Sequence, residues 1–90
     1  MTRAAVQLFD RVALAADVPA EALRRGDIAV VVDRVEGDGV EDGYVLEVFN
    51  ALGETLTVVD VPVSAVVPLS ANEVLAVRPL AETAAAASRQ

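Results

Sequence analysis

The 90-residue sequence contains no histidine, no cysteine, no lysine and no tryptophan. Without histidine and cysteine it has no Ser-His-Asp or Cys-His nucleophilic system and no zinc site made of imidazole or thiolate ligands. The lack of lysine excludes Schiff-base chemistry. Carboxylates, hydroxyls, arginines and one tyrosine remain. We therefore expect a protein that is not an enzyme and that has no cofactor.

The charge is strongly unbalanced, with 7 arginines against 14 acidic residues and a net charge of −7. Valine, leucine, isoleucine and phenylalanine make up 30 of the 90 residues, too many for an intrinsically disordered chain. Residues 1–9 lack the apolar stretch of a signal peptide. The longest uncharged run before the tail, residues 61–72, contains two prolines and is shorter than the roughly 20 residues of a membrane-spanning helix. We expect a soluble, cytoplasmic protein that does not contact membranes.

Valine is the most abundant residue, with 18 copies, and β-branched residues favour strands. Short apolar runs separated by glycine and proline predict an all-β sandwich or small barrel. The predicted strands lie within residues 8–15, 28–32, 44–49, 55–61 and 63–67. The last of these segments contains a short turn followed by a strand. Residues 17–23 predict one helical turn, with Asp17 near its cap. In the third strand, Tyr44, Leu46 and Val48 share one face.

Residues 70–80 fit two alternatives. Ser70-Ala71-Asn72-Glu73 matches the capping box that begins helices, whereas Val74-Leu75-Ala76-Val77 prefers a strand. We favour the strand. One domain is expected over residues 1–80, followed by an alanine-rich tail, residues 81–90, that is frayed or disordered.

Two of the predicted strands are too apolar for a monomeric barrel. Residues 28–32 are apolar on both faces, and residues 55–61 nearly so, although a strand with one wet face should alternate. Apolar side chains on the outer face need a cover, either the C-terminal segment or another subunit. We predict a homo-oligomer.

Several short motifs follow one another in an order that resembles one protein family. They are Leu8-Phe9-Asp10, Val12-Ala13-Leu14, Leu23-Arg24-Arg25-Gly26-Asp27, Val30-Val31-Val32, Tyr44 to Phe49, and the ending Pro62…Ser64…Pro68-Leu69. In this order they resemble the bacterial domain-of-unknown-function family DUF4926, over about residues 8–70. The resemblance implies a small SH3-like barrel of about five strands and implies no activity. The expected fold is therefore all-β, an SH3-like barrel with one short helical turn and a C-terminal extension.

The turn Arg24-Arg25-Gly26-Asp27 is the first candidate for partner binding. Its two arginines could form a fork for a phosphate or carboxylate. The favoured interpretation is a tight turn before a strand, in which Gly26 supplies an unusual backbone angle.

The glycine-rich loop with Glu36, Asp38, Glu41 and Asp42 is the second candidate. Four carboxylates could hold a calcium ion, but their spacing differs from that of an EF-hand, and Asp-Gly is common in hairpins. We expect no metal. Together the two turns supply the partner-binding candidates Arg24, Arg25, Asp27, Glu41 and Asp42.

The acidity also bears on the kind of partner. Small SH3-like barrels often bind RNA, but phosphate binding depends on basic residues, and a chain at −7 without lysine is a poor candidate for nucleic acid. The leading hypothesis is a non-enzymatic protein–protein interaction module that binds a basic partner. In this hypothesis the protein neutralises or stabilises that partner, the product of a neighbouring gene. The alternatives are a structural or accessory subunit of a homo-oligomer, or a small-molecule or metal-binding module.

Overall fold

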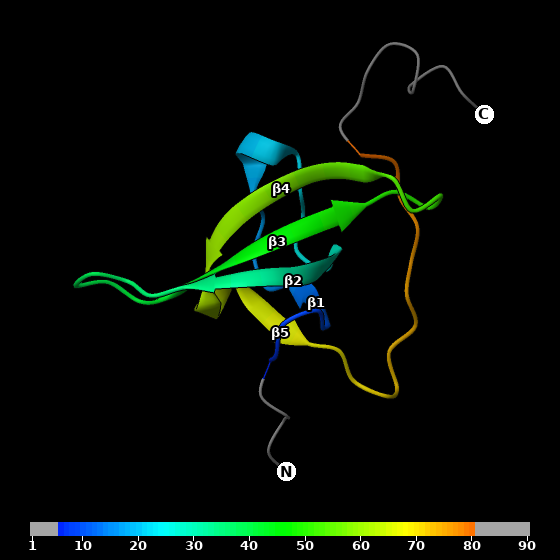
Figure 1. The fold of residues 1–90 in the computed structure, drawn as a ribbon. Coiled ribbons are helices and arrows are strands. Elements are labelled where there is room, and N and C mark those ends of the chain that lie inside the picture. The colour runs from blue at the N-terminus through cyan, green and yellow to red at the C-terminus, as the bar shows by residue number, and fades with distance from the viewer. Residues whose placement is uncertain (1–5, 81–90) are drawn as a thin grey trace.

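The structure, a computed structural model, describes residues 6–80 and contains one five-stranded antiparallel sheet (Figure 1). The strands are β1 (Arg11–Leu14), β2 (Ile28–Val35), β3 (Gly43–Phe49), β4 (Thr55–Pro62) and β5 (Val66–Pro68). Two 3-10 turns, η1 (Pro19–Glu21) and η2 (Val63–Ala65), precede β2 and β5. The sheet order is β4-β3-β2-β1-β5, so the last strand returns to the side of the first. The expected all-β fold of five strands is confirmed, and its strand order is that of an SH3-like barrel.

The core lies on one face of the sheet because side chains alternate along each strand. Tyr44, Leu46 and Val48 of β3 are all buried, as their spacing predicts. Leu46 lies opposite Val31 of β2 and Val59 of β4. The buried cluster comprises Val12, Leu14, Leu23, Ala29, Val31, Tyr44, Leu46, Val48, Val61 and Val66.

A β-bulge in β2 changes the direction of its charged end. The register with β3 shifts between Val31 and Asp33, so that Arg34 pairs with Tyr44. An extra residue in one strand moves every later side chain to the other face. The bulge thus places Arg34 beside the tyrosine, whose ring centroid lies 5.5 Å from the guanidinium carbon.

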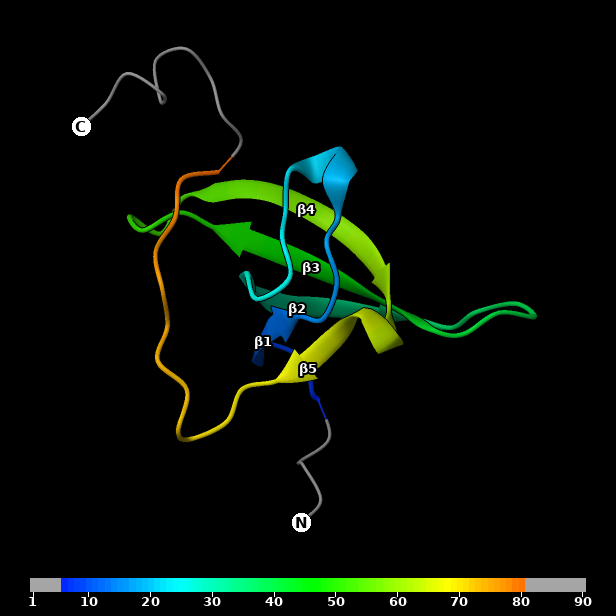
Figure 2. The same cartoon turned by 180° about the vertical axis from the view of Figure 1, so that it is seen from behind.

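The segment between β1 and β2 crosses the buried face of the sheet (Figures 1 and 2). Leu23 inserts into the core, and the Thr57 hydroxyl donates a 2.7 Å hydrogen bond to Glu21, which joins η1 to β4. The predicted helical turn is present, but Asp17 does not cap it. Val18 takes the cap position, and the Asp17 carboxylate accepts the Arg25 N–H at 2.9 Å.

The prediction of a strand within residues 70–80 is wrong. Residues 69–80, which we call the strap, have no helix and no strand and run past one end of the barrel toward the β3–β4 turn (Figure 2). Glu73 does accept the Ser70 N–H, as in a capping box, but the backbone stops after one turn. A strand needs a neighbouring edge, and residues 74–77 form no backbone pair with a described strand. The predicted tail, residues 81–90, lies outside the described residues.

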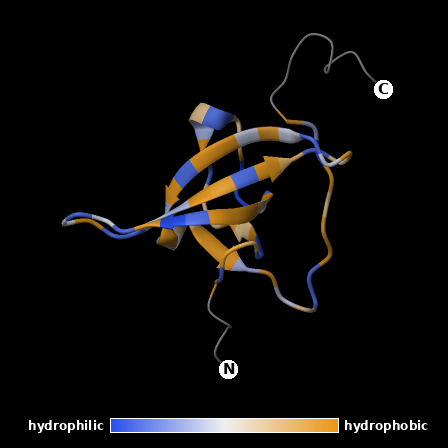
Figure 3. Ribbon diagram, in the orientation of Figure 1, coloured by the Kyte–Doolittle hydropathy of each residue, from blue (hydrophilic) through white to orange (hydrophobic). Residues whose placement is uncertain are grey.

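The outer face of the sheet keeps several exposed apolar side chains, and the strands are largely hydrophobic in Figure 3. Leu56 and Val58 of β4 are 42% and 54% exposed. Both side chains keep this exposure with residues 69–80 in place, so the described part of the strap does not bury them. The predicted homo-oligomer stays a prediction.

Candidate functional site

The loop between β2 and β3, residues 36–42, projects beyond the sheet and is mostly hydrophilic (Figures 1 and 3). We call it the acidic loop. Together with the end of β4 it forms an open pocket of about 680 Å³, the acidic pocket. The lining residues are Val35, Glu36, Gly37, Asp38, Val40, Glu41, Asp42, Gly43, Tyr44, Asp60, Val61 and Pro62. Five of them are acidic and none is basic, so the pocket favours a cation.

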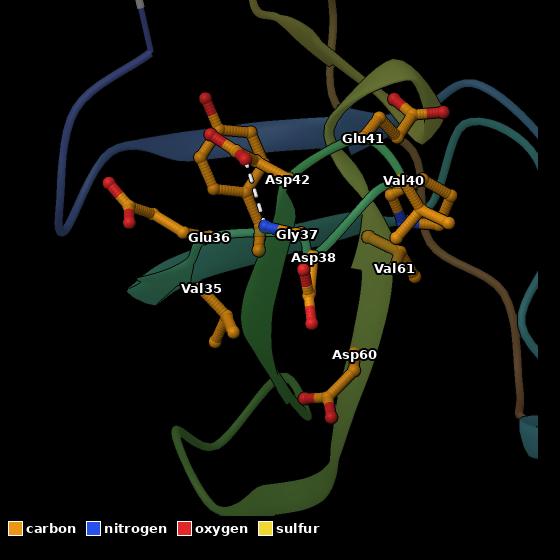
Figure 4. Close-up of a pocket in the computed structure, with 12 residues that line it drawn as sticks. Val35, Glu36, Gly37, Asp38, Val40, Glu41, Asp42, Asp60 and Val61 are labelled. Atoms are coloured by element: carbon orange, nitrogen blue, oxygen red, sulfur yellow. Dashed lines mark hydrogen bonds between the residues drawn. The ribbon is translucent and has the colours of Figure 1, made fainter.

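Gly37 and Asp42 give the acidic loop its shape (Figure 4). A Cβ at position 37 would lie 2.1 Å from the Val40 carbonyl oxygen, so only glycine fits there. The Asp42 carboxylate accepts the Gly37 N–H at 3.0 Å and closes the base of the loop. The other carboxylate oxygen accepts a hydrogen bond from Arg34 at 2.7 Å. These hydrogen bonds hold the pKa of Asp42 below its ordinary value, and the bond from the Gly37 N–H has the larger effect of the two.

Glu41 ties the acidic loop to η2. One carboxylate oxygen accepts the Ser64 hydroxyl at 3.0 Å and the other accepts the Ser64 N–H at 3.1 Å. Next to it, Val63 donates its N–H to the Asp42 carbonyl at 2.9 Å. Glu41 and Asp42, both partner-binding candidates, therefore position the loop with all four of their carboxylate oxygens.

The other three acidic groups of the pocket are Glu36, Asp38 and Asp60. Within residues 6–80 they have no hydrogen bond or ion pair, and all three are exposed. Asp60 was not a sequence candidate because it is 18 residues from Asp42 in sequence, and only the pairing of β3 with β4 brings it to the loop. These three carboxylates are free to meet a ligand.

The remaining candidates, Arg24, Arg25 and Asp27, lie just before β2, whereas the acidic loop follows its end. The eight residues of β2 span roughly 25 Å, so the two clusters are separate sites. Gly26 has φ +93°, which confirms the interpretation of a tight turn. The arginine side chains are exposed and make no ion pair with a described carboxylate.

Asp27 is engaged within the molecule. Arg78 of the strap contacts both of its carboxylate oxygens, with a 2.9 Å bond from Nε to Oδ1, and the Arg24 N–H donates to Oδ2 at 2.8 Å. Burial raises the pKa of Asp27, but these hydrogen bonds and the positive charges outweigh burial and bring the pKa below its ordinary value. Arg78 was missed in the sequence because no local pattern links residues 51 positions apart.

No group of three acidic, histidine or cysteine side chains in the described chain could hold a metal ion. Figure 4 shows why the acidic loop fails in this respect, since Glu36 and Glu41 point in different directions from its two ends. No helix of residues 6–80 is long and apolar enough to cross a membrane.

Fold and site together define a small acidic all-β domain of SH3-like strand order. A family model described as Domain of unknown function (DUF4926) matches residues 8–68, and the chain belongs to this family. The match includes the acidic loop and the Arg24–Asp27 turn but not Arg78. No curated protein and no solved structure matches the chain.

Proposed function

We propose that this protein is a non-enzymatic interaction module that binds a basic protein through the acidic pocket. The observation that supports the proposal is the set of three exposed carboxylates, Glu36, Asp38 and Asp60, that form no hydrogen bond or ion pair within residues 6–80. They stand beside apolar side chains of the same pocket, including Val40 and Pro62.

Arginine and lysine side chains match this combination. Their aliphatic stems pack on apolar surface while the charged head reaches a carboxylate. A charge-assisted hydrogen bond to an unpaired carboxylate is also stronger than one between neutral groups. The net charge of −7 attracts a basic partner over a longer range.

The proposed partner is the product of a neighbouring gene, which this protein would neutralise or stabilise in the cytoplasm. Small size and the lack of histidine, cysteine and lysine fit that role. Co-expression should yield a complex of the two proteins in equal amounts. Recovery of each protein alone would contradict the proposal.

A double variant tests the pocket. Asp38→Asn with Asp60→Asn should weaken the complex about tenfold or more, which corresponds to at least ~1.4 kcal/mol from lost charge-assisted bonds. The matched control is Asp10→Asn with Glu73→Gln, which changes the net charge equally. Asp10 accepts the backbone N–H of Gln7, and Glu73 accepts that of Ser70. The amide oxygens of the substituted side chains can accept the same hydrogen bonds. Titration calorimetry measures both, and equal losses would show that only net charge matters.

The exposed apolar side chains of β4 favour a second candidate, a structural subunit of a homo-oligomer. Leu56 and Val58 lie on the outer face of β4 and are 42% and 54% exposed. An interface on this face would bury them. Light scattering should then give a fixed mass above that of the monomer, independent of any partner.

A further inference from the structure

A second cleft of the molecule is rich in arginine. It lies between the strap and the barrel, with a volume of about 810 Å³, and we call it the arginine cleft. Four of the five arginines in residues 6–80 line it, namely Arg11, Arg24, Arg25 and Arg78, and Asp27 is its one acidic residue. The cleft is thus positive in a protein whose net charge is −7.

Of these four arginines only Arg78 forms an ion pair within residues 6–80, although Arg24 also acts electrostatically on Asp27, and Asp17 on Arg78. Asp27 is paired with Arg78, and Arg11, Arg24 and Arg25 form no ion pair with any described carboxylate. Their side chains are exposed. The cleft also has apolar walls, to which Val48, Phe49 and Leu75 contribute. Such a cleft suits an acidic segment that also bears an apolar side chain.

The acidic loop has these properties. Glu36 and Asp38 are exposed and unpaired in the described chain, and Val40 between them and β3 is 74% exposed. The loop projects away from the sheet, so it can reach into another molecule (Figures 1 and 2). Within one molecule the two surfaces lie at opposite ends of β2 and cannot meet.

We infer that the acidic loop of one copy docks into the arginine cleft of a second copy. This inference rests on the proposed function, because the same loop is the docking surface for a positively charged partner. The contact joins two different surfaces, so it leaves one loop and one cleft free at the ends and generates chains or rings. Repulsion between two molecules of charge −7 opposes it, and the assembly is therefore weak and dependent on concentration.

Two variants and their mixture test the contact. The cleft variant carries Arg11→Gln, Arg24→Gln and Arg25→Gln, and the loop variant carries Glu36→Gln and Asp38→Asn. All five side chains are exposed and donate or accept no hydrogen bond within residues 6–80, so both variants should fold, as a thermal melt verifies.

Sedimentation equilibrium from micromolar to millimolar protein gives the result. The average mass of the wild type should rise with concentration, and each variant alone should stay a monomer. An equimolar mixture should form pairs and stop there, because only one intact loop and one intact cleft remain. This rescue also shows that the greater negative charge of the cleft variant is not what prevents its association.

Three outcomes overturn the inference: a wild type that stays monomeric at millimolar concentration, variants that associate as the wild type does, or a mixture that forms no pairs. Binding of the basic partner by the two variants distinguishes failure of this inference from failure of the proposed function. The cleft variant should bind the partner as tightly as the wild type, and the loop variant should not. Retained partner binding by the loop variant would contradict the proposed function itself.

Discussion

At the scale of single residues, the carboxylates divide into those that hold the backbone and those that face solvent. Asp42 and Glu41 use every oxygen to fix the acidic loop, and Asp27 holds the strap through Arg78. Residue type alone does not distinguish them from Asp38 and Asp60. Their positions at the base of a loop or in a turn decide which oxygens meet an N–H.

The pairing of Asp27 with Arg78 predicts a pH-dependent stability. Folding lowers the pKa of Asp27, so its ionised carboxylate adds to the free energy of unfolding. This stabilisation is complete above the pKa of the unfolded state, about 4, and is lost as the pH falls through the lower pKa of the folded state. Asp27→Asn should cost about 1–3 kcal/mol at pH 7 and progressively less below pH ~4. Urea unfolding at a series of pH values measures this difference. The control is Asp10→Asn, at an exposed carboxylate without an ion pair, and a penalty at Asp27 that ignores pH would contradict the prediction.

Ala22 provides a prediction about backbone strain. It ends η1 with φ +59°, a left-handed conformation that costs a non-glycine residue roughly 1–2 kcal/mol. Glycine removes this cost but adds roughly 0.5–1 kcal/mol of unfolded-state entropy. Ala22→Gly should therefore be neutral or stabilising, whereas Ala20→Gly within η1 should destabilise by about 0.5–1 kcal/mol. Equal losses at both positions in thermal unfolding would argue against strain at Ala22.

At the scale of elements, apolar runs bounded by glycine and proline predicted the strands well. Residues 44–49 and 55–61 match β3 and β4 to within one residue. The first strand is shorter than predicted, because Phe9 adopts φ +70° and bends the chain before Arg11. The strap was mispredicted because its valines favour extended backbone while no sheet edge is paired with it. No residue near Val31 in the sequence indicated the β-bulge that follows it, although this bulge decides on which face of the sheet Arg34 lies.

A matched pair of substitutions tests the two faces of the sheet. Val31 is completely buried, so Val31→Thr should cost about 1–3 kcal/mol from the buried hydroxyl. Val58 is exposed, so Val58→Thr should change the stability by less than about 0.5 kcal/mol in a monomer. Chemical denaturation at several protein concentrations measures both. A large, concentration-dependent cost at Val58 would instead indicate an oligomer that buries the outer face.

At the scale of the whole molecule, the net charge conceals a separation of charge. Five acidic residues line the pocket at one end of β2, and four arginines line the cleft at the other. The total of −7 predicted attraction to basic partners and excluded neither self-association nor a local positive surface. In the proposed self-association, the positive cleft offsets the repulsion between like-charged copies.

The long-range field gives a prediction for the partner complex. If the charge of −7 steers association, the association rate should fall by about tenfold or more between ~0.05 M and ~0.5 M salt, because the Debye length shrinks severalfold. The dissociation rate should change much less. Surface plasmon resonance separates the two rates. An association rate that is insensitive to salt would show that the acidic surface does not guide the encounter.

The sequence by itself determined the acidic charge, the absence of catalytic histidine and cysteine, the all-β class and most strand positions. These properties depend on composition and on periodicity between near neighbours. The tertiary structure alone decided which carboxylates are free, because Asp60 reaches the acidic loop through β-pairing and Asp27 meets Arg78 across 51 positions. It also decided that Glu41 holds the acidic loop on Ser64, 23 positions further along the chain. Contacts between distant residues depend on the folded register, which no local pattern in the chain encodes.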